Sequence, residues 1–336
     1  MQQKTLENWK PKVGGLFSGV GGIELGFEKS GFEIAWANEI DKNSCITYRE
    51  NFSHKLYEED IRNLEGKDLE PVDVLCGGFP CQAFSVAGYR KGFEDDRGNI
   101  FFEIIRLINE LKTKPTVLFL ENVKNFKSHD QGRTFQRVIQ EISDLGYSVF
   151  FDVLNTCDYT EIPQNRERTF LICFKGEHNW QFSGETDSMS HKFSGLFPPS
   201  KVKSNKPIRD FLENNKEVPE SFFYRKDKYM YSELRETMKS KDTLYQWRRQ
   251  YVRENKSNQC PTLTANMGTG GHNVPLIYTE DGYRKLTPRE CFNFQGFPKG
   301  FKLPEEMANS HLYKQAGNSV TVRLIRVLAE KIHEVL

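Results

Sequence analysis

The chain has 336 residues, 28% of them charged, which is enough length for one large or two modest domains with a buried core. Its net charge of +1 gives no reason by itself to expect a nucleic-acid partner. Seven irregularly spaced cysteines exclude a framework of paired disulfides, and Cys76 and Cys81 have no second Cys/His pair at a zinc-like distance, so no metal site is expected.

Apolar segments are short throughout the sequence. No run approaches the roughly 18 apolar residues of a membrane span, and the N-terminus "MQQKTLENWKPK" lacks the apolar core of a signal peptide. Unpaired thiols suit a reducing compartment. We therefore expect a soluble, cytoplasmic protein.

Short β-rich runs alternate with helical patterns from Val13 to about Phe174. In the stretch 99–112, Ile104, Leu107 and Ile108 fall on one face at helical spacing. The alternation predicts an α/β sheet flanked by helices. Strands are expected from Val13 onward and over 32–39, 71–76, 116–123, 147–155 and 168–174, and helices over 21–31, 43–52, 99–112 and 134–146.

The pattern changes after Lys175. Residues 177–285 are polar and rich in loops, without a clear helix–strand rhythm, and we interpret them as a second, smaller domain. Within them, the stretch 201–256 holds 15 Lys and Arg against 9 Asp and Glu. Such an excess is typical either of a solvated polar face or of a surface that binds a polyanion.

Helical patterns return near the end of the chain. Thr287 can cap a helix that has Pro288 at its first position. A last helix is expected over 318–336, and its apolar positions repeat every four residues at Val320, Leu324 and Leu328. Residues 286–336 are therefore expected to complete the first domain, which spans 1–176.

A glycine cluster, Gly14 to Gly22, lies where the first strand meets the first helix, and such a turn lets a ligand approach the backbone closely. Glu39 ends the next strand about 20 residues on, where an acidic side chain can accept both ribose hydroxyls. Asp60 lies near the following strand position, where it can accept a hydrogen bond from an adenine amine. Each carboxylate alone is also typical of a solvated loop, but their order along the strands favours an adenosine-type ligand.

The stretch "VDVLCGGFPCQAFSVAG" raises the question of what Cys81 does. Cys76 ends the apolar run and suits a strand core, whereas Cys81 lies beyond two glycines and is held by Pro80 in a loop. Buried filler and a reactive thiol both remain open for Cys81 on this pattern.

Two further groups follow the apolar strands. Glu121 ends the strand in "FLENV", where it can point into the crevice at the carboxyl edge of a sheet or cap the next segment. Arg166 and Arg168 in "QNRER" lie on one face if the chain is extended, although such pairs also serve as surface ion-pair partners.

Seven motifs carry a family resemblance. "LFSGVGG", "NEID", "GGFPCQAFS", "ENV", "QNRER", "RKLTPRECFNFQGFP" and "QAGNSV" occur in this order over most of the chain. Together they closely resemble the motif series of DNA (cytosine-5) methyltransferases of bacterial restriction–modification systems. The resemblance implies a Rossmann-like, S-adenosylmethionine-dependent methyltransferase sheet with a smaller, loop-rich target-recognition domain over 177–285.

The resemblance also implies a catalytic set. Cys81 would attack C6 of a flipped cytosine, Glu121 would contact N3 and the exocyclic amine, and Arg168 would contact O2. Arg166 would hold Glu121 and the catalytic loop in place. The chemistry agrees, because cysteine is partly ionised near neutral pH and because an acid at N3 and a cation at O2 stabilise the addition.

S-adenosylmethionine is the implied cofactor. Phe17 would stack on it, Glu39 would bind its ribose, and Ile40 and Asp60 would contact the adenine. One departure is Gly15, where the family often has Asp. The remaining expected cofactor contacts are Ser18, Gly19, Gly21, Gly22, Ile61, Pro80, Asn318, Ser319 and Val320.

Double-stranded DNA is the implied partner. The loop from Gln82 to Gly98 would close over it, and the second domain would read its sequence, since arginine can bind guanine edges. A short GC-rich palindrome is the expected target, and a monomer with a restriction endonuclease encoded nearby is the expected arrangement. The expected DNA contacts are Gln82, Ser85, Arg97, Arg248, Arg249, Arg253 and Thr264.

Three alternatives are weighed against this interpretation. A transferase acting on tRNA cytosine would share the core, but the large recognition domain favours duplex DNA. A non-catalytic DNA-binding protein would not need Cys81, Glu121 and Arg168 together. A thiol hydrolase or redox enzyme would need a well-placed histidine, and no motif surrounds His54, His129 or His311.

Overall fold

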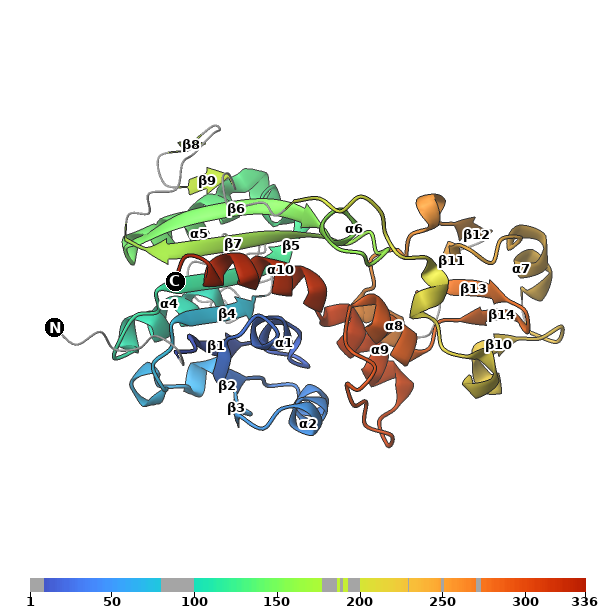
Figure 1. Cartoon of the computed structure of the whole chain (residues 1–336), viewed down its shortest axis with the longest axis horizontal. Coiled ribbons are helices and arrows are strands. Elements are labelled where there is room, and N and C mark those ends of the chain that lie inside the picture. The colour runs from blue at the N-terminus through green and yellow to red at the C-terminus, as the bar shows by residue number, and fades with distance from the viewer. Residues whose placement is uncertain are drawn as a thin grey trace.

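The computed structural model describes residues 9–79, 100–176, 186–187, 190–192, 200–228, 230–248, 251–269 and 273–336. These residues form two lobes, one around a large sheet and one around a smaller sheet (Figure 1). Among the described helices, none is both long and apolar enough to cross a membrane.

The large sheet has the strand order β3-β2-β1-β4-β5-β7-β6-β9-β8. Strands β3, β2, β1, β4 and β5 run parallel to one another. Strand β7 is antiparallel to both β5 and β6. The central strands are apolar on both faces because helices cover both sides of the sheet. The strands are β1 (Lys12–Leu16), β2 (Glu33–Asn38), β3 (Lys55–Tyr57), β4 (Val74–Gly78), β5 (Val117–Val123), β6 (Tyr147–Asn155), β7 (Glu167–Lys175), β8 (Thr186–Asp187) and β9 (Ser190–Lys192).

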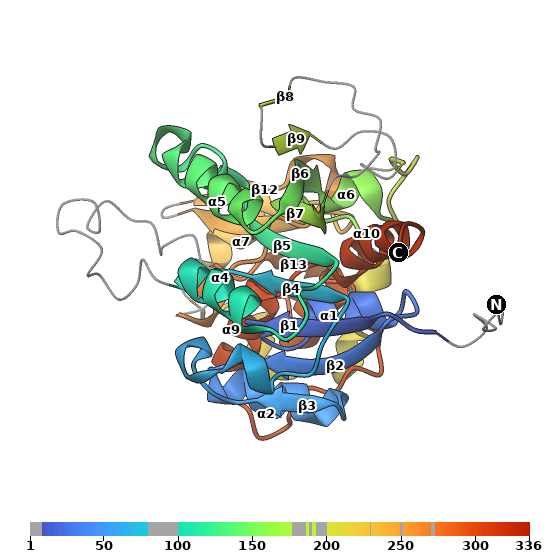
Figure 2. The ribbon, with the colours of Figure 1, turned by 90° about the vertical axis from the view of Figure 1, so that its left-hand side faces the viewer.

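Helices lie on both faces of this sheet. Figure 2 shows α4 (Ile100–Glu110) and α5 (Arg133–Asp144) on one face and α1 (Gly22–Glu28) and α10 (Val322–His333) on the other. Each pair of helices buries an apolar stripe against the sheet, which gives two hydrophobic cores. Two further helices of this lobe are α2 (Lys42–Asn51) and α6 (Thr156–Tyr159).

The second lobe differs from the expected loop-rich region, because it contains a five-stranded antiparallel sheet. Its strands are only two to five residues long and are separated by polar loops, so their period is hard to detect in the sequence. The order is β10 (Phe223–Tyr224), β14 (Gly282–Lys285), β13 (Leu276–Thr279), β11 (Leu244–Arg248) and β12 (Tyr251–Glu254), and α7 (Tyr231–Thr237) accompanies them.

The C-terminal residues divide between the lobes. Helices α8 (Pro288–Phe294) and α9 (Asn309–Asn318) share a hydrophobic core with Leu244 and Ile277 of the small sheet, whereas α10 packs against α1. Thr287 caps α8 through a capping box with Glu290, as expected. The division of the chain into 1–176 with 286–336 and 177–285 stays a prediction.

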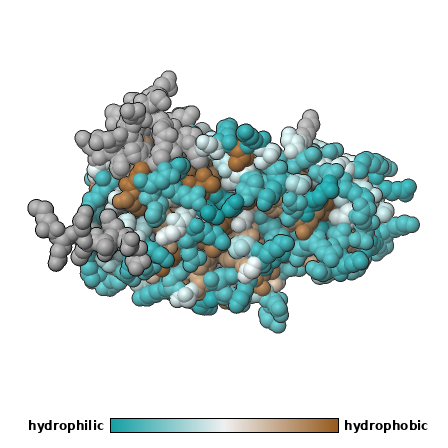
Figure 3. Space-filling view, viewed as in Figure 1, coloured by the Kyte–Doolittle hydropathy of each residue, from teal (hydrophilic) through white to brown (hydrophobic). Residues whose placement is uncertain are grey.

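The last helix begins later than expected. The stretch expected as one helix over 318–336 instead ends α9 at Asn318, leaves the helical conformation at Ser319 and starts α10 at Val322. Val320 is still buried with Leu324 and Leu328, although it lies outside the helix. Hydrophilic residues cover most of the face in Figure 3, and hydrophobic residues form small separate groups.

Candidate active site and cofactor site

A cavity of about 380 Å³ lies at the carboxyl ends of β1, β2, β4 and β5. Its walls bring together segments that are far apart in the sequence, which is where ligands bind in sheets of this kind. The expected site residues that line it are Phe17, Ser18, Gly19, Gly22, Glu39, Glu121, Arg166, Arg168, Asn318, Ser319 and Val320.

The turn after β1 forms one wall. Phe17 and Gly21 both have positive φ, which bends the chain sharply before α1. A Cβ on Gly22 would lie 2.7 Å from Ser319 Oγ, so the glycine lets the C-terminal segment approach closely. The glycine cluster therefore lets the turn after β1 pack closely against the segment around Ser319 at this cavity.

Glu39 is held rigidly by the backbone. The N–H of Gly19 donates to Glu39 Oε2 at 2.7 Å, and the N–H groups of Ile40 and Asp41 donate to Oε1 at 2.8 and 2.7 Å. These three bonds use both lone pairs of Oε1 and one of the two on Oε2. The side chain can therefore accept one further hydrogen bond of ordinary geometry, at Oε2, from a ligand in the cavity.

Four of the expected cofactor contacts do not line this cavity. Gly21 packs against Phe52, and Ile40 has 61% of its surface exposed. Asp60 forms an ion pair with Arg62, with Nη2 2.8 Å from Oδ2, and Ile61 is buried. Pro80 lies outside the described residues. Contacts between these residues and a cofactor stay predictions.

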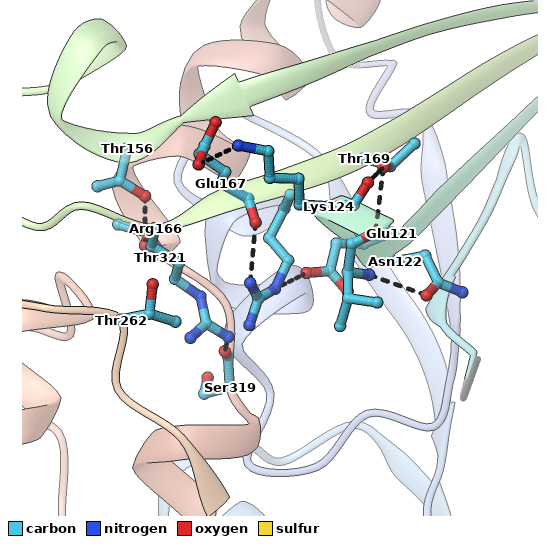
Figure 4. A network of polar contacts seen from close by, with 12 residues as sticks. Glu121, Asn122, Lys124, Thr156, Arg166, Glu167, Thr169, Thr262, Ser319 and Thr321 are labelled. Carbon is cyan, nitrogen blue, oxygen red and sulfur yellow. Dashed lines mark hydrogen bonds and ion pairs between the residues drawn. The ribbon is translucent and has the colours of Figure 1, made fainter. Parts of the chain in front are cut away.

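Glu121 and Arg168 form the charged pair of the cavity. Arg168 Nε lies 3.0 Å from Glu121 Oε1, and both side chains are mostly buried. In the antiparallel register of β5 and β7, Arg168 lies opposite Val123. Val123 and Glu121 are two residues apart on β5 and point to the same face of the sheet, so Arg168 is a diagonal neighbour of Glu121. Figure 4 shows Glu121 and Asn122 side by side at the end of β5.

The chain that leads to Cys81 begins beside this pair. Gly78 lies opposite Glu121 in the parallel register of β4 and β5, and Asn122 Nδ2 donates to the Phe79 carbonyl at 3.0 Å. Cys81 follows two residues later, and with Gln82, Ser85 and Arg97 it lies outside the described residues. The last described residues before Cys81, Gly78 and Phe79, are thus fixed next to Glu121 and Asn122.

Among the described residues, Arg166 forms no hydrogen bond or ion pair with Glu121, although the two charges interact, and its expected role in holding Glu121 and the catalytic loop stays a prediction. Arg166 is buried, and its guanidinium donates to the carbonyl of Leu263 at 2.8 Å and to the carbonyls of Gly317 and Ser319. Figure 4 shows Arg166 beside Ser319. Burial lowers the pKa of Arg166 to about 9, so it stays charged at neutral pH. Because Arg166 precedes β7, it turns toward the second lobe, and Arg168 takes the place beside Glu121.

Sequence reasoning missed the far wall of the cavity. Asp41, Asn43, His311 and Lys314 line it, and Lys314 Nζ lies 3.0 Å from Asp41 Oδ2. Asn43 and His311 are 3.3 Å apart. Asp41 ends the motif "NEID" but was given no role, and His311 and Lys314 were missed because α9 was not expected as a separate helix.

A second cavity of about 680 Å³ lies between the start of β7 and the small sheet. Arg248, Arg253 and Thr264 line it, and Arg249 lies outside the described residues. Gln246 Oε1 accepts hydrogen bonds from Arg253 Nη2 at 2.8 Å and from Arg248 Nη2 at 3.3 Å. Sequence reasoning singled out the arginines but not the amide that joins them.

Comparisons with known proteins agree on one family. A model of the C-5 cytosine-specific DNA methylases matches residues 12–334. The Type II methyltransferase M.Bsp6I of Bacillus sp. (strain RFL6) is 53% identical over 328 residues, which cover 96% of this chain and 98% of that protein. M.HhaI of Haemophilus parahaemolyticus is 38% identical over 330 residues, covering 94% and 92%.

The chain belongs to the C-5 cytosine-specific DNA methylases. Its fold agrees, since the structure of a Dnmt2 methyltransferase of S. pombe superimposes with a TM-score of 0.72 at 19% identity and covers 97% of this chain and 99% of the other. The large sheet is thus a Rossmann-like methyltransferase sheet, and the protein is a DNA cytosine-5 methyltransferase.

Methylases of this family use S-adenosylmethionine as methyl donor. The residues of the first cavity fit such a polar ligand. The hydroxyl of Ser319 is buried at its wall without a hydrogen-bond partner among the described residues, the hydroxyl of Ser18 also lies at this wall, and Glu39 keeps one free lone pair on Oε2. These groups would hold the cofactor, which supplies an electrophilic methyl group when bound.

Proposed function

We propose that this methylase attacks C6 of a cytosine flipped out of duplex DNA with the thiolate of Cys81 and so makes C5 nucleophilic. The observation that carries the proposal is the Glu121–Arg168 pair beside the start of the Cys81 loop. Cytosine C5 lies inside the base stack of a duplex, so the base has to leave the stack before a side chain can reach it.

The pair suits the charges that develop on the ring. Addition of a thiolate to C6 sends electron density to N3 and O2 of cytosine. Glu121 donates a proton or hydrogen bond at N3, and Arg168 stabilises the charge at O2. After methyl transfer to C5, loss of the C5 proton and elimination of Cys81 restore the aromatic ring and the free thiolate.

The other cysteines support Cys81 as the nucleophile. The six described cysteines are all buried and unpaired. Burial raises the pKa of their thiols, to about 11 for Cys45 and Cys157 and upward for Cys76, Cys173, Cys260 and Cys291. A thiol with a raised pKa is a poor source of thiolate at neutral pH.

DNA that carries 5-fluorocytosine at the target position tests the covalent step. Fluorine cannot leave C5 as a proton does, so we expect a stable adduct in the presence of cofactor, located at Cys81 by peptide mapping. Cys81→Ser should form no adduct while still binding DNA, and Cys157→Ala should form it normally. An adduct that maps elsewhere, or none at all, would remove Cys81 from the mechanism.

Target reading by residues 177–285 is part of this proposal. Eleven arginines of the described chain form ion pairs with acidic side chains, but Arg248 and Arg253 have no acidic partner there and converge on the neutral amide of Gln246. Two unneutralised cations at a polar cavity suit the acceptors N7 and O6 of guanine.

Loss of a reading arginine should relax the choice of sequence. We expect Arg253→Ala to lower discrimination at one base pair by about 1–3 kcal/mol, measured by bisulfite sequencing of methylated random DNA. Arg235→Ala is the control, because Arg235 is also exposed and without an ion pair in the described chain but lies on α7. Unchanged site choice in Arg253→Ala would show that the second cavity does not read bases.

The relatives' names place them among Type II methyltransferases, so we propose that double-stranded DNA is the substrate and that a cognate endonuclease accompanies the enzyme. We propose a monomer as the acting form. Methylation of tRNA in place of duplex DNA by the purified enzyme would overturn the substrate.

A further inference from the structure

The carboxyl group of Glu24 is buried directly behind the cofactor cavity. Glu24 lies in the first turn of α1 and is 1% exposed. A Cβ on Gly15 would overlap Glu24 Oε1 and lie 2.9 Å from Ser18 Oγ. The carboxyl group therefore fills the space that a side chain at position 15 would take. Ser18 lines the cavity and lies between it and this carboxyl group.

This carboxyl group has no cation to balance it. Among the described residues, Glu24 forms no ion pair, and its Oε2 has no hydrogen-bond partner. The Ser18 hydroxyl and the backbone N–H of Glu24 are neutral donors beside the carboxyl group that lower its pKa, but neither supplies a positive charge. A buried carboxylate without a cation is strongly disfavoured, so a group of this kind is expected either to hold a proton or to await a positive ligand.

The titratable groups around Glu24 make an anion less favourable still. The charge of Glu39 interacts with that of Glu24 across the glycine turn. The charge of Glu24 also acts on Tyr48 of α2 and Cys76 of β4, and none of these three groups is cationic. On α10, which packs against α1, Arg323 and Arg326 are paired with Glu161 and Glu330. Burial, and secondarily the charge of Glu39, raises the pKa of Glu24 to about 7.

The bound cofactor supplies the missing charge. S-adenosylmethionine carries a sulfonium and an ammonium against one carboxylate, so it brings a net positive charge to this side of Ser18. We propose that Glu24 is the counter-charge that the protein holds for this cationic cofactor, and that its carboxyl group releases a proton to solvent as the cofactor binds.

The expected pH dependence follows from the sign of this exchange. Near and below pH 7 the free enzyme holds the Glu24 proton and has to release it, so affinity for the cofactor weakens as the pH falls. Well above pH 7 the carboxylate is already formed, so no proton is released and affinity levels off. Each unit by which the bound cofactor lowers the pKa corresponds to a tenfold gain in affinity at high pH.

Titration calorimetry in buffers of different ionisation enthalpy measures the released proton directly. At pH 7 we expect the wild-type enzyme to release a fraction of a proton on binding S-adenosylmethionine, and less on binding S-adenosylhomocysteine, which lacks the sulfonium charge. Glu24→Gln should release less and bind S-adenosylmethionine about tenfold more weakly at pH 8. Glu28→Gln, at an exposed position on the same helix, should behave as wild type.

A relocated carboxyl group gives a second test. Glu24→Ala should lose the proton release, and Gly15→Asp/Glu24→Ala should restore it together with affinity, because the new side chain starts where the old carboxyl group lay. Circular dichroism confirms that each variant is folded. A Glu24→Gln variant with wild-type proton release and affinity, or a folded double variant without recovery, would overturn the proposal.

Discussion

At the scale of single residues, the cavity depends on which polar groups are already satisfied. Three backbone N–H groups hold the two oxygens of Glu39 in place, so the one lone pair left on Oε2 is preorganised for a ligand. Arg166 is occupied with three backbone carbonyls and therefore serves to position segments, whereas Arg168 faces Glu121 across the open site. Both arginines line the first cavity, and Arg168 is the one that we propose to act on the substrate.

Glu121→Gln separates binding from chemistry at this scale. The amide keeps the size and can offer an N–H to N3, but it cannot transfer a proton or carry the charge that faces Arg168. General acid catalysis supplies roughly 10²–10⁴-fold, so we expect a loss of that size in single-turnover methylation with saturating DNA and cofactor. Affinity for S-adenosylmethionine should change little, and a near wild-type rate would remove Glu121 from the catalytic set.

At the scale of elements, the sequence predicted the large sheet well and the second lobe poorly. Long apolar runs such as the one that forms β5, and the amphipathic stripe of α5, have periods that only one element type satisfies. The two- to five-residue strands of the small sheet are too short to show a period. The break between α9 and α10 was missed because Val320 keeps the apolar spacing of a helix while lying outside one.

The site shows the same limit. Motif order predicted which residues meet at the first cavity, but the pairing of Glu121 with Arg168 depends on the antiparallel register of β5 and β7, which no local pattern specifies. Gln246 and Glu24 carry no motif either. Their proposed roles follow only from their surroundings in the fold. Gln246 accepts hydrogen bonds from two arginines without ion pairs in the described chain, and Glu24 fills the space beside Gly15 that a side chain there would take.

A buried ion pair joins β14 to α8. Arg284 Nη2 and Nη1 lie 2.7 and 2.8 Å from the two oxygens of Glu290, and both side chains are fully buried. Removal of one partner leaves an uncompensated buried charge, so we expect Glu290→Leu to lower the free energy of unfolding by about 3–5 kcal/mol in urea denaturation. Glu330→Gln, in a half-exposed pair with Arg326, should change it by less than about 1 kcal/mol.

The double variant Arg284→Met/Glu290→Leu refines this test. It removes both charges and keeps the volume, so it should unfold at a free energy closer to wild type than Glu290→Leu alone. If Glu290→Leu proved as mild as the Glu330 control, the pair would not hold α8 against the small sheet.

At the scale of the whole molecule, the two lobes are joined by more than a linker. Arg166 donates to the carbonyls of Leu263 and of Ser319, which lies at the wall of the first cavity, and a Cβ on Gly317 would overlap the backbone of Thr264. The hydrophobic core that holds the small sheet also contains residues of α8 and α9. The segment that we propose to read DNA is thus packed directly onto the segment that closes the first cavity.

This packing determines how an exchange of residues 177–285 with a related methylase should behave. Arg284 lies inside the exchanged segment and its partner Glu290 outside it, so the donor has to supply an arginine at this position for the hybrid to fold. A hybrid that meets this condition should methylate the donor's site, as mapped by bisulfite sequencing, because the cavity with Arg248 and Arg253 moves with the segment while Glu121 and Arg168 stay. A donor without the arginine should give an unstable hybrid that a matching change at Glu290 rescues. An active, stable hybrid that keeps the original site would place target reading outside 177–285 and return the second cavity to a structural role.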